Sequence, residues 1–497
     1  MPVKMPAPDH AVLNGRDHIV KALRAIVPGE GVIATETEMR PYESDALTAY
    51  RQLPLVVVLP DTVDQVCRVL RYCHAEGIKV VPRGAGTSLS GGALPAQDGV
   101  LLGMAKFNRV REIDLENRVV VAEPGVTNVA VTQAVEHAGF YYAPDPSSQI
   151  ACTIGGNVAE NSGGVHCLKY GVTSNNVLGL EMVLMTGEIV RVGGKHLDSG
   201  GYDLLGVMTG SEGLLGVITE VTVRILRKPE CARAMLVGFA TSEAAGDCVA
   251  RIIGAGIIPG GMEMMDRPAI HAVEQFVHAG YPLDVEALLI VELDGAQAEV
   301  DHLLPRVEAI ALECGAQTCR VAGSESERLL FWAGRKAAFP AVGRISPDYY
   351  CMDGTIPRAQ LPRVLKRMRE MAKVHRLAVA NVFHAGDGNL HPLILYDANQ
   401  PGELERAEAF GADILRLCVE VGGVLTGEHG VGVEKRELMP SMFTDIDLAH
   451  QQRLKCAFDE RGLLNPGKVF PTLHRCAELG RMHVRAGKLP FPHLPRF

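Results

Sequence analysis

The sequence predicts an α+β protein made of two or three domains. The chain has 497 residues, more than a single hydrophobic core usually organises. Short apolar runs of strand-like composition alternate with amphipathic helical patterns, and many of the 53 glycines gather in a few segments, where backbone can approach a ligand closely. An Asp387-Gly388 pair between apolar flanks is a strong signal for an antiparallel β-hairpin.

The N-terminal elements predict a β-α-β unit. An apolar run at 55–59 predicts a buried strand, and Asp61-Thr62 then opens an amphipathic helix that ends at Gly77. A second strand is expected at 79–81. It leads into a glycine-rich loop at 82–93, in which Leu89 occupies the third glycine of a dinucleotide fingerprint. The loop therefore does not fit that fingerprint, but its exposed backbone N–H groups can form an anion-binding nest.

Further short elements continue to residue 228. We expect strands at 119–121, 180–185, 189–192 and 220–226, and a helix at 129–137. Glycine-rich segments at 143–148, 153–164 and 210–219 lie between them, and helix with so many glycines costs roughly 1 kcal/mol per glycine against alanine. Such a sequence favours a ligand or tight packing there. Lys228-Pro229 is the predicted domain boundary.

An α+β pattern follows the boundary, with a strand at 288–293 and a helix at 360–374 among its elements. The segment 461–469 ends this domain and is expected to fold back on the first. Beyond Pro471 the chain turns basic, and both a solvated tail and a segment that docks on a subunit fit this composition. One acid, Glu478, stands there against Arg475, Arg481, Arg485, Lys488 and Arg496.

Composition excludes several classes of protein. Hydrophobic residues make up 47% and charged residues 22%, the balance of a soluble globular protein. The net charge is −9 without a concentrated basic patch in the body of the chain, which argues against a nucleic-acid partner. No apolar run reaches about 18 residues, and residues 1–10 lack the apolar core of a signal peptide. We therefore expect a cytoplasmic protein without a transmembrane segment.

The spacing of the cysteines does not match that of a bound electron carrier. The 12 cysteines show neither the C-x-x-C spacing of zinc and redox sites nor an iron–sulfur ligand run. They are scattered through apolar context, as in a reduced cytosolic protein. If the chain carries out redox chemistry, onward electron transfer needs another carrier or subunit.

The hairpin around Asp387-Gly388 carries the strongest candidate site. If these two residues form the turn, His384 faces His391, and directly opposed residues have Cβ atoms roughly 4.5–5.5 Å apart. Two imidazoles at that spacing can converge on one metal ion, and Glu428 with His429 adds a carboxylate and a third imidazole on a glycine-flanked backbone. Three N/O ligands with an open position indicate a catalytic metal site. A cross-strand histidine pair without a metal is the alternative.

These segments, in this order, resemble the flavin-dependent oxidoreductases of the vanillyl-alcohol-oxidase/p-cresol-methylhydroxylase superfamily. Within it they are most similar to the group of glycolate oxidase flavoprotein subunits and D-lactate and D-2-hydroxyglutarate dehydrogenases. The resemblance covers residues 40 to 471. It implies a two-part FAD-binding domain of the p-cresol-methylhydroxylase type and an α+β substrate (cap) domain with an antiparallel sheet. The implied divisions are an N-terminal segment at 1–50, the FAD-binding domain at 51–228, the cap domain at 229–460, a return segment at 461–471 and a tail at 472–497.

The same resemblance implies which residues bind FAD. In the first loop, the pyrophosphate would be cradled by Arg83, Gly84, Ala85, Gly86, Thr87 and Ser88. Beside the cofactor would lie Pro144, Asp145, Ser148, Thr153, Gly155, Gly156, Asn157, Asn161, Gly163, Gly164 and Tyr170. The adenosine side would be contacted by Glu212, Gly213 and Ile218, and Asn465 would return towards the flavin. Because no histidine occurs in the Arg83-to-Ala93 loop, we expect non-covalent FAD.

For the reaction, the resemblance implies oxidation of a small 2-hydroxy acid, with glycolate preferred, to the 2-oxo acid by hydride transfer to flavin N5. The metal would be held by His384, His391 and Glu428, with His429 as the base and Arg335 on the substrate carboxylate. This donor set suits Zn²⁺, with Mn²⁺ and Fe²⁺ as alternatives. Electrons would pass to a quinone or to partner subunits that include an iron–sulfur carrier, and such a complex could associate with the inner face of the membrane.

The alternatives to this interpretation concern the substrate and the class of protein. The D-2-hydroxyglutarate enzymes have a lysine and a threonine where this chain has Cys351 and Phe339, which favours a small monocarboxylate. Arg344 could supply a replacement cation, so D-lactate and D-2-hydroxyglutarate stay open as substrates. A metal-dependent hydrolase and a scaffold subunit that binds FAD without activity are the alternatives of another kind.

Overall fold

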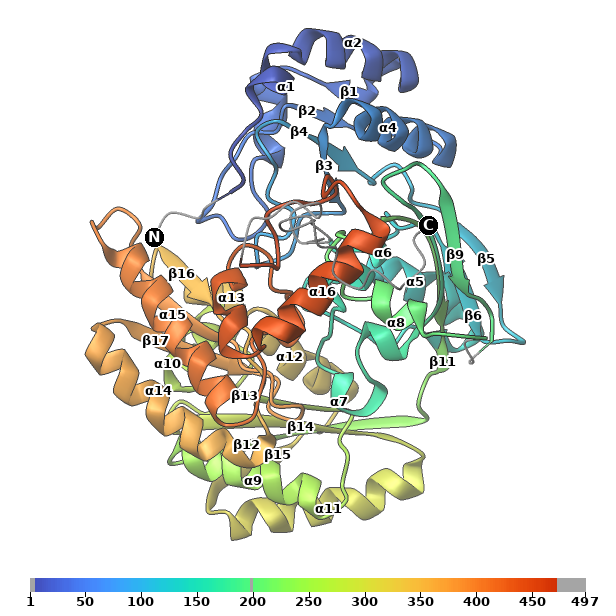
Figure 1. Ribbon diagram of the computed structural model, residues 1–497. Coiled ribbons are helices and arrows are strands. Elements are labelled where there is room, and N and C mark those ends of the chain that lie inside the picture. The colour runs from blue at the N-terminus through green and yellow to red at the C-terminus, as the bar shows by residue number, and fades with distance from the viewer. Residues whose placement is uncertain (1–4, 197–199, 472–497) are drawn as a thin grey trace, which may run out of the picture.

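The computed structural model describes residues 5–196 and 200–471, so the basic tail predicted at 472–497 lies outside the described residues. Three main β-sheets with covering helices organise this part of the chain, and antiparallel pairs dominate two of them (Figure 1). The predicted α+β class is thus confirmed. Within the described residues, every helix is too short or too polar to cross a membrane.

The first sheet contains the predicted β-α-β unit, and its strand order is β1-β2-β4-β3. Its strands are β1 (Val32–Ile33), β2 (Val56–Val58), β3 (Lys79–Arg83) and β4 (Gly99–Gly103). Its helices are α1 (His10–Asn14), α2 (Arg16–Ile26), α3 (Glu36–Met39) and α4 (Val63–Glu76). The predicted helix is confirmed as α4, because the Thr62 side chain caps its first turn and Gly77, with φ +71°, ends it.

The second sheet is antiparallel, with the order β5-β6-β10-β8-β9, and a small pair β11-β7 joins it. The strands are β5 (Val110–Asp114), β6 (Val119–Ala122), β7 (Phe140–Tyr141), β8 (Val177–Val183), β9 (Ile189–Gly193), β10 (Val217–Arg224) and β11 (Leu226–Arg227). The helices are α5 (Asn128–Val135), α6 (Ile154–Glu160), α7 (Cys167–Tyr170) and α8 (Leu204–Met208). The strand expected at 220–226 begins three residues earlier, because apolar Val217 and Ile218 already pair with β8.

The third sheet follows Lys228-Pro229 and is antiparallel, with the order β15-β12-β14-β13-β17-β18-β16. Its strands are β12 (Cys231–Phe239), β13 (Gly261–Asp266), β14 (Ala287–Gly295), β15 (Ala316–Val321), β16 (Asp348–Cys351), β17 (Ala378–Phe383) and β18 (Pro392–Tyr396). Its helices are α9 (Ser242–Gly254), α10 (Arg267–Val277), α11 (Gln297–Glu313), α12 (Glu325–Lys336), α13 (Ala338–Val342), α14 (Leu361–His375) and α15 (Glu403–Glu420). Alternate residues of β14 enter two cores, one under α9, α11, α14 and α15 and one under α10, α12 and α13. The sheet is therefore buried on both faces.

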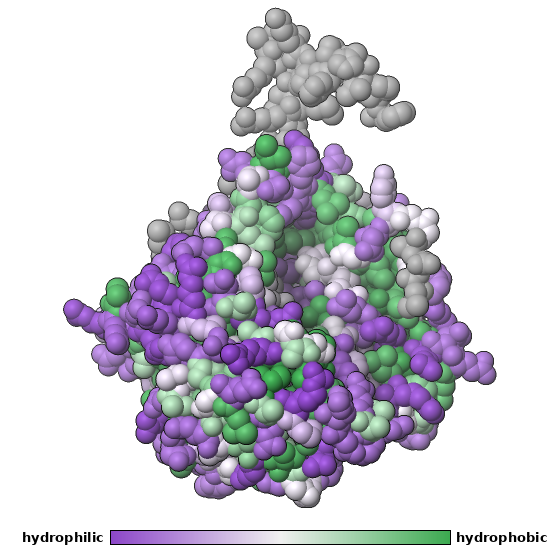
Figure 2. Space-filling view, turned by 90° about the horizontal axis from the view of Figure 1, so that it is seen from below, coloured by the Kyte–Doolittle hydropathy of each residue, from purple (hydrophilic) through white to green (hydrophobic). Residues whose placement is uncertain are grey.

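The end of the described chain returns to the first sheet. After α16 (Asp445–Phe458), the segment 461–469 runs beside β3. Val80 N–H donates to Leu463 C=O at 2.8 Å, and Asn465 N–H donates to Val80 C=O at 2.7 Å. The chain thus connects the third-sheet domain back to the first sheet. In Figure 2 hydrophilic side chains cover most of the face shown, and that face is hollowed below the grey segment.

Candidate active site

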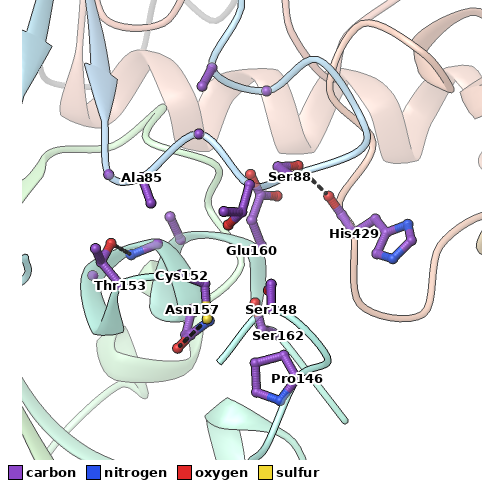
Figure 3. A pocket seen from close by; sticks show the side chains of 18 of the residues that line it. Ala85, Ser88, Pro146, Ser148, Cys152, Thr153, Asn157, Glu160, Ser162 and His429 are labelled. Atoms are coloured by element: carbon purple, nitrogen blue, oxygen red, sulfur yellow. Dashed lines mark hydrogen bonds between the residues drawn. The ribbon is translucent and has the colours of Figure 1, made fainter. Parts of the chain in front are cut away.

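A cavity of about 480 Å³ connects the glycine-rich loops of the N-terminal half with the histidines of the C-terminal half. The loop after β3, the start of α6 and the segment before β10 form one side of it (Figure 3). The end of α12 and the histidine segments form the other. Lining residues from the C-terminal half are Lys336, Phe339, Pro340, His391, Glu428 and His429.

Many of the residues assigned to FAD line this cavity. They are Arg83, Gly84, Ala85, Gly86, Thr87, Ser88, Ser148, Thr153, Gly155, Gly156, Asn157, Glu212, Gly213 and Ile218. A Cβ placed on Gly84 would lie 2.5 Å from Thr153 Oγ1, so glycine there lets the first loop approach α6. Gly86, at φ +71°, gives the same loop its left-handed turn. Two glycine-rich backbones facing one cavity suit a cofactor with phosphate groups.

The other residues assigned to FAD do not line the cavity. Pro144 C=O accepts from Asn128, Asp145 pairs with His166, and the Tyr170 hydroxyl donates to Asp294 Oδ2 at 2.5 Å. Asn161 ends α6 in a left-handed conformation, and Gly164 packs on Asp145. Gly163 N–H donates to Glu428 Oε2 at 3.0 Å, and Asn465 donates to Gly92 C=O and Glu212 C=O. Most of these residues support the loops that form the wall.

The histidine hairpin has a longer turn than the sequence predicted. Asn381 pairs with Pro392, and the next bridge joins His384 to Asn389. The turn therefore spans 385–388. The predicted two-residue turn at Asp387-Gly388 would need a left-handed backbone at both residues, but only Gly388, at φ +85°, has one. The predicted pairing of His384 with His391 is wrong by two residues. Because side chains alternate with a period of two, both rings still share one face, with centroids 5.0 Å apart.

Glu428 reaches both hairpin histidines. Its Oε1 lies 3.1 Å from His384 Nε2 and 3.3 Å from His391 Nε2. Donor atoms of these three residues all lie within 4.8 Å of one another, as a metal site requires. On its far side His384 Nδ1 lies 2.7 Å from Glu263 Oε1, the kind of contact that orients a ligand histidine. Burial opposes ionisation, but the neighbouring histidines lower the pKa of Glu428 to about 2.

Asp353 is a site residue that sequence reasoning missed. It is fully buried, and its carboxylate accepts the backbone N–H groups of Gly427, Glu428 and His429. Its side chain also pairs with buried Lys435 at 3.2 Å. Donor atoms of Asp353, His391 and His429 likewise lie within 4.8 Å of one another. The only sequence signal for it is an Asp-Gly pair that begins two residues after the end of β16.

His429 occupies the cavity wall beside His391. Its backbone N–H donates to Asp353 Oδ2 at 2.9 Å, and its C=O accepts from Ser88 Oγ at 3.2 Å (Figure 3). Burial lowers the pKa of His429 to about 4, which keeps the imidazole neutral near pH 7. A neutral imidazole on a cavity wall can accept a proton.

Arg335 and Lys336 point in different directions from the end of α12. Arg335 is 1% exposed, and its Nη2 lies 2.7 Å from Glu263 Oε2. It is not among the cavity-lining residues, and its Nη1 has no hydrogen-bond acceptor within the described chain. Lys336 does line the cavity, with Nζ 3.8 Å from Asp145 Oδ2. The structure thus places a lysine on the wall and the arginine one layer behind it.

Comparison with known proteins agrees with this architecture. Residues 54–193 match the family described as FAD binding domain, and residues 228–469 match the C-terminal domain of FAD linked oxidases. A glycolate oxidase subunit GlcD of Escherichia coli K12 is 57% identical over 482 residues, 97% of each chain. A glycolate oxidase subunit GlcD of Bacillus subtilis 168 is 39% identical over 430 residues, 86% of this chain and 92% of the relative.

Comparison with solved structures supports the fold. Substrate-bound p-cresol methylhydroxylase superposes with a TM-score of 0.78 at 17% identity, covering 93% of this chain and 98% of that one. With both halves matched to the same kind of protein, the chain belongs to the FAD-linked oxidase family and is an FAD-dependent oxidoreductase.

Proposed function

We propose that this chain oxidises a small 2-hydroxy acid, glycolate first, to the corresponding 2-oxo acid. The observation that carries this proposal is the single cavity that joins the glycine-rich loops to the cluster of His391, Glu428 and His429. The names of the two similar relatives, both glycolate oxidase subunits, support glycolate as the substrate. A metal-dependent hydrolase would leave the match to FAD-binding families unexplained.

Bound FAD supplies the two-electron acceptor for this oxidation. Supporting residues on this chain are the 83–88 loop, the start of α6 and the Glu212-Gly213 turn, all on the cavity wall. Within the described residues no histidine lies in the 83–93 loop, which fits non-covalent binding. The remaining residues assigned to FAD would support the loops of that wall. They are Pro144, Asp145, Asn161, Gly163, Gly164, Tyr170 and Asn465.

His384, His391 and Glu428 would hold a divalent cation, with Zn²⁺ best suited to two imidazoles and a carboxylate. Such an ion would act as a Lewis acid on the substrate hydroxyl. The donor geometry supports this, and so does His391 Nε2, which is buried without a hydrogen-bond partner among the described residues. Glu263 fixes the orientation of His384.

His429 would take the proton from the substrate hydroxyl. Its ring is neutral, the residue lies on the cavity wall, and its backbone N–H and C=O are both held by hydrogen bonds. A general base must lie within reach of the proton and be unprotonated when the substrate binds. His429 therefore meets them without further rearrangement of its backbone.

The substrate carboxylate would lie near the end of α12. Lys336 supplies a cation on the wall, and the neighbouring Arg335 has one buried nitrogen, Nη1, without an acceptor among the described residues. Phe339 and Pro340 make the adjoining wall apolar. Arg344 donates to Gln275 C=O at 3.0 Å and stacks on Phe276, so its charge is directed at α10. This arrangement favours a monocarboxylate over a dicarboxylate such as D-2-hydroxyglutarate.

Electrons would leave through partner subunits or a quinone. The similar relatives are named as subunits, which implies a complex, and we propose that it includes an iron–sulfur carrier. We further propose a cytoplasmic location, with the complex meeting the inner face of the membrane.

Substrate choice is tested by turnover with an artificial electron acceptor. We expect the highest kcat/KM for glycolate, a lower value for D-lactate and the lowest for D-2-hydroxyglutarate. A preference for D-2-hydroxyglutarate would overturn the monocarboxylate assignment, and a preference for D-lactate would shift the proposal to its first alternative.

A further inference from the structure

We propose that Glu212 is a positioning residue that fixes the segment carrying His429, in addition to its place on the cofactor cavity wall. This inference rests on the proposed function only in taking His429 as the base. Glu212 belongs to the turn before β10 in the FAD-side half, whereas His429 belongs to the third-sheet domain. The proposal therefore assigns Glu212 to catalysis across the junction between the two halves.

The carboxylate of Glu212 points at the chain just after His429. Its Oε1 accepts the N–H of Val431 at 2.7 Å, and its Oε2 accepts the N–H of Gly432 at 2.7 Å. The side chain is buried. Both N–H groups need an acceptor there, because an unpaired buried N–H is strongly unfavourable.

The backbone of Glu212 is itself held in an unusual conformation. Its φ is +51°, in the left-handed region that a glutamate rarely adopts. The N–H of Glu212 donates to Ala159 C=O at 2.8 Å, and its C=O accepts from Asn465 Nδ2 at 2.6 Å. Strain of this kind persists where surrounding contacts determine it, and such places cluster at functional sites. These two contacts aim the carboxylate at Val431 and Gly432.

Close approach is possible because residue 430 is a glycine. Gly430 has φ +84°, and a Cβ there would overlap Glu160 Oε2 and lie 3.1 Å from Glu212 Oε1. The side of Gly430 where a Cβ would stand therefore faces two buried carboxyl groups. The next two residues of the segment are held by Ser90, whose C=O accepts the N–H groups of Val433 and Glu434 at 3.0 and 3.1 Å. Glu212 and Ser90 together accept the backbone N–H groups of four consecutive residues, 431–434.

A glutamine at 212 tests this contact with little change in shape. Its amide offers one acceptor oxygen and one NH₂ group, so one of the two N–H groups of Val431 and Gly432 would face a donor. Glu434→Gln is the matched control, because the Glu434 side chain in the same segment is only 2% exposed and its carboxylate lies 3.5 Å from Lys435 Nζ instead of binding this backbone.

The experiment is anaerobic reduction of the FAD-loaded enzyme by glycolate in a stopped-flow spectrometer. For Glu212→Gln we expect FAD binding and the apparent glycolate affinity to stay near wild type. The rate constant of flavin reduction should fall roughly 10–100-fold, as for a misplaced catalytic group. Partial unfolding would lower the amplitude and leave the rate constant alone. Glu434→Gln should keep the wild-type rate constant.

Amide hydrogen exchange of the peptide spanning 429–433 gives a second readout that needs no substrate. Faster exchange is expected in Glu212→Gln, and unchanged exchange would overturn the inference. Failure of glycolate to reduce the wild-type flavin would refute the proposed function alone, and the exchange measurement would still test the inference. A wild-type rate constant in Glu212→Gln, or loss of FAD with normal reduction of the remaining holoenzyme, would also overturn it. If that variant does not fold, Glu212→Asp keeps both oxygens on a shorter arm and should show the same changes to a smaller extent.

Discussion

The imidazole rings of His391 and His429 lie parallel, with centroids 4.9 Å apart and an interplanar angle of 2°. One ring comes from the β-hairpin and the other from the loop after α15. Asp353 lies against both, with Oδ1 3.5 Å from His391 Nε2 and Oδ2 4.0 Å from His429 Nδ1. A single buried carboxylate thus sets the distance between a proposed metal ligand and the proposed base.

Replacing Asp353 with asparagine should destabilise the protein and inactivate it. The change leaves fully buried Lys435 without its closest carboxylate, and breaking a buried pair in this way typically costs about 3–5 kcal/mol. It also weakens the acceptor for three consecutive backbone N–H groups. Urea denaturation and turnover measure the two effects. Asp348→Asn, at the start of β16, is the control, and an Asp353→Asn protein of wild-type stability would contradict this role.

Replacing His384 with alanine should remove the divalent ion and the activity together. His384 contacts Glu428 on one side and Glu263 on the other, so its loss leaves Glu263 without a histidine partner and Glu428 with His391 alone. Elemental analysis and turnover on the same sample test this. His375→Ala is the control, because His375 stacks on Phe410 at the end of α14 and pairs with Asp413. A His384→Ala enzyme that is active and free of metal would refute the metal assignment.

Lys336 and Arg335 should respond differently to substitution by methionine. Lys336 is partly exposed, so Lys336→Met should raise the KM for glycolate up to about fivefold with little change in metal content. Arg335→Met should also lower metal content, since Arg335 holds the Glu263 that orients His384. Steady-state kinetics with elemental analysis separates the two. An unchanged KM in Lys336→Met would exclude its contact with the substrate.

His166 lies at the junction of the two halves and should make the stability of the protein depend on pH. Burial alone would lower its pKa, but Asp145 at 3.0 Å and Glu292 at 3.4 Å raise the pKa of His166 to about 10 from an ordinary value of 6.5. The stabilisation is therefore complete below pH 6.5 and is lost as the pH rises towards 10. The melting temperature of His166→Gln should fall furthest below wild type at the acidic end. A constant difference over this range would contradict the assignment.

Local patterns were sufficient to predict much of the fold. Thr62 and Gly77 mark the two ends of α4, and period-two alternation placed His384 and His391 on one face although the register was wrong. Register depends on turn geometry, and Asp-Gly occurs in both two-residue and longer turns. The backbone of Asp387 is not left-handed here, and its side chain caps Asn389 N–H at 3.0 Å instead.

Long-range partners could not be predicted in the same way. Asp353 is separated by 76 residues from the His429 N–H that it binds, and Glu212 by 219 from that of Val431. A single acidic residue carries no periodic signal that identifies such a partner. The direction of Arg335 likewise depends on Glu263, which comes from a distant strand. Sequence motifs thus located the loops, whereas the carboxylates that hold them emerged only from the fold.

The most direct test of the central claim is the absorbance spectrum of the FAD-loaded protein before and after anaerobic addition of glycolate. We expect the flavin bands to bleach in wild type. In His429→Asn the protein should stay yellow, with reduction slowed by about 10²–10⁴-fold because the general base is absent. A wild-type spectrum that no 2-hydroxy acid changes, or full bleaching at the normal rate in His429→Asn, would contradict the account.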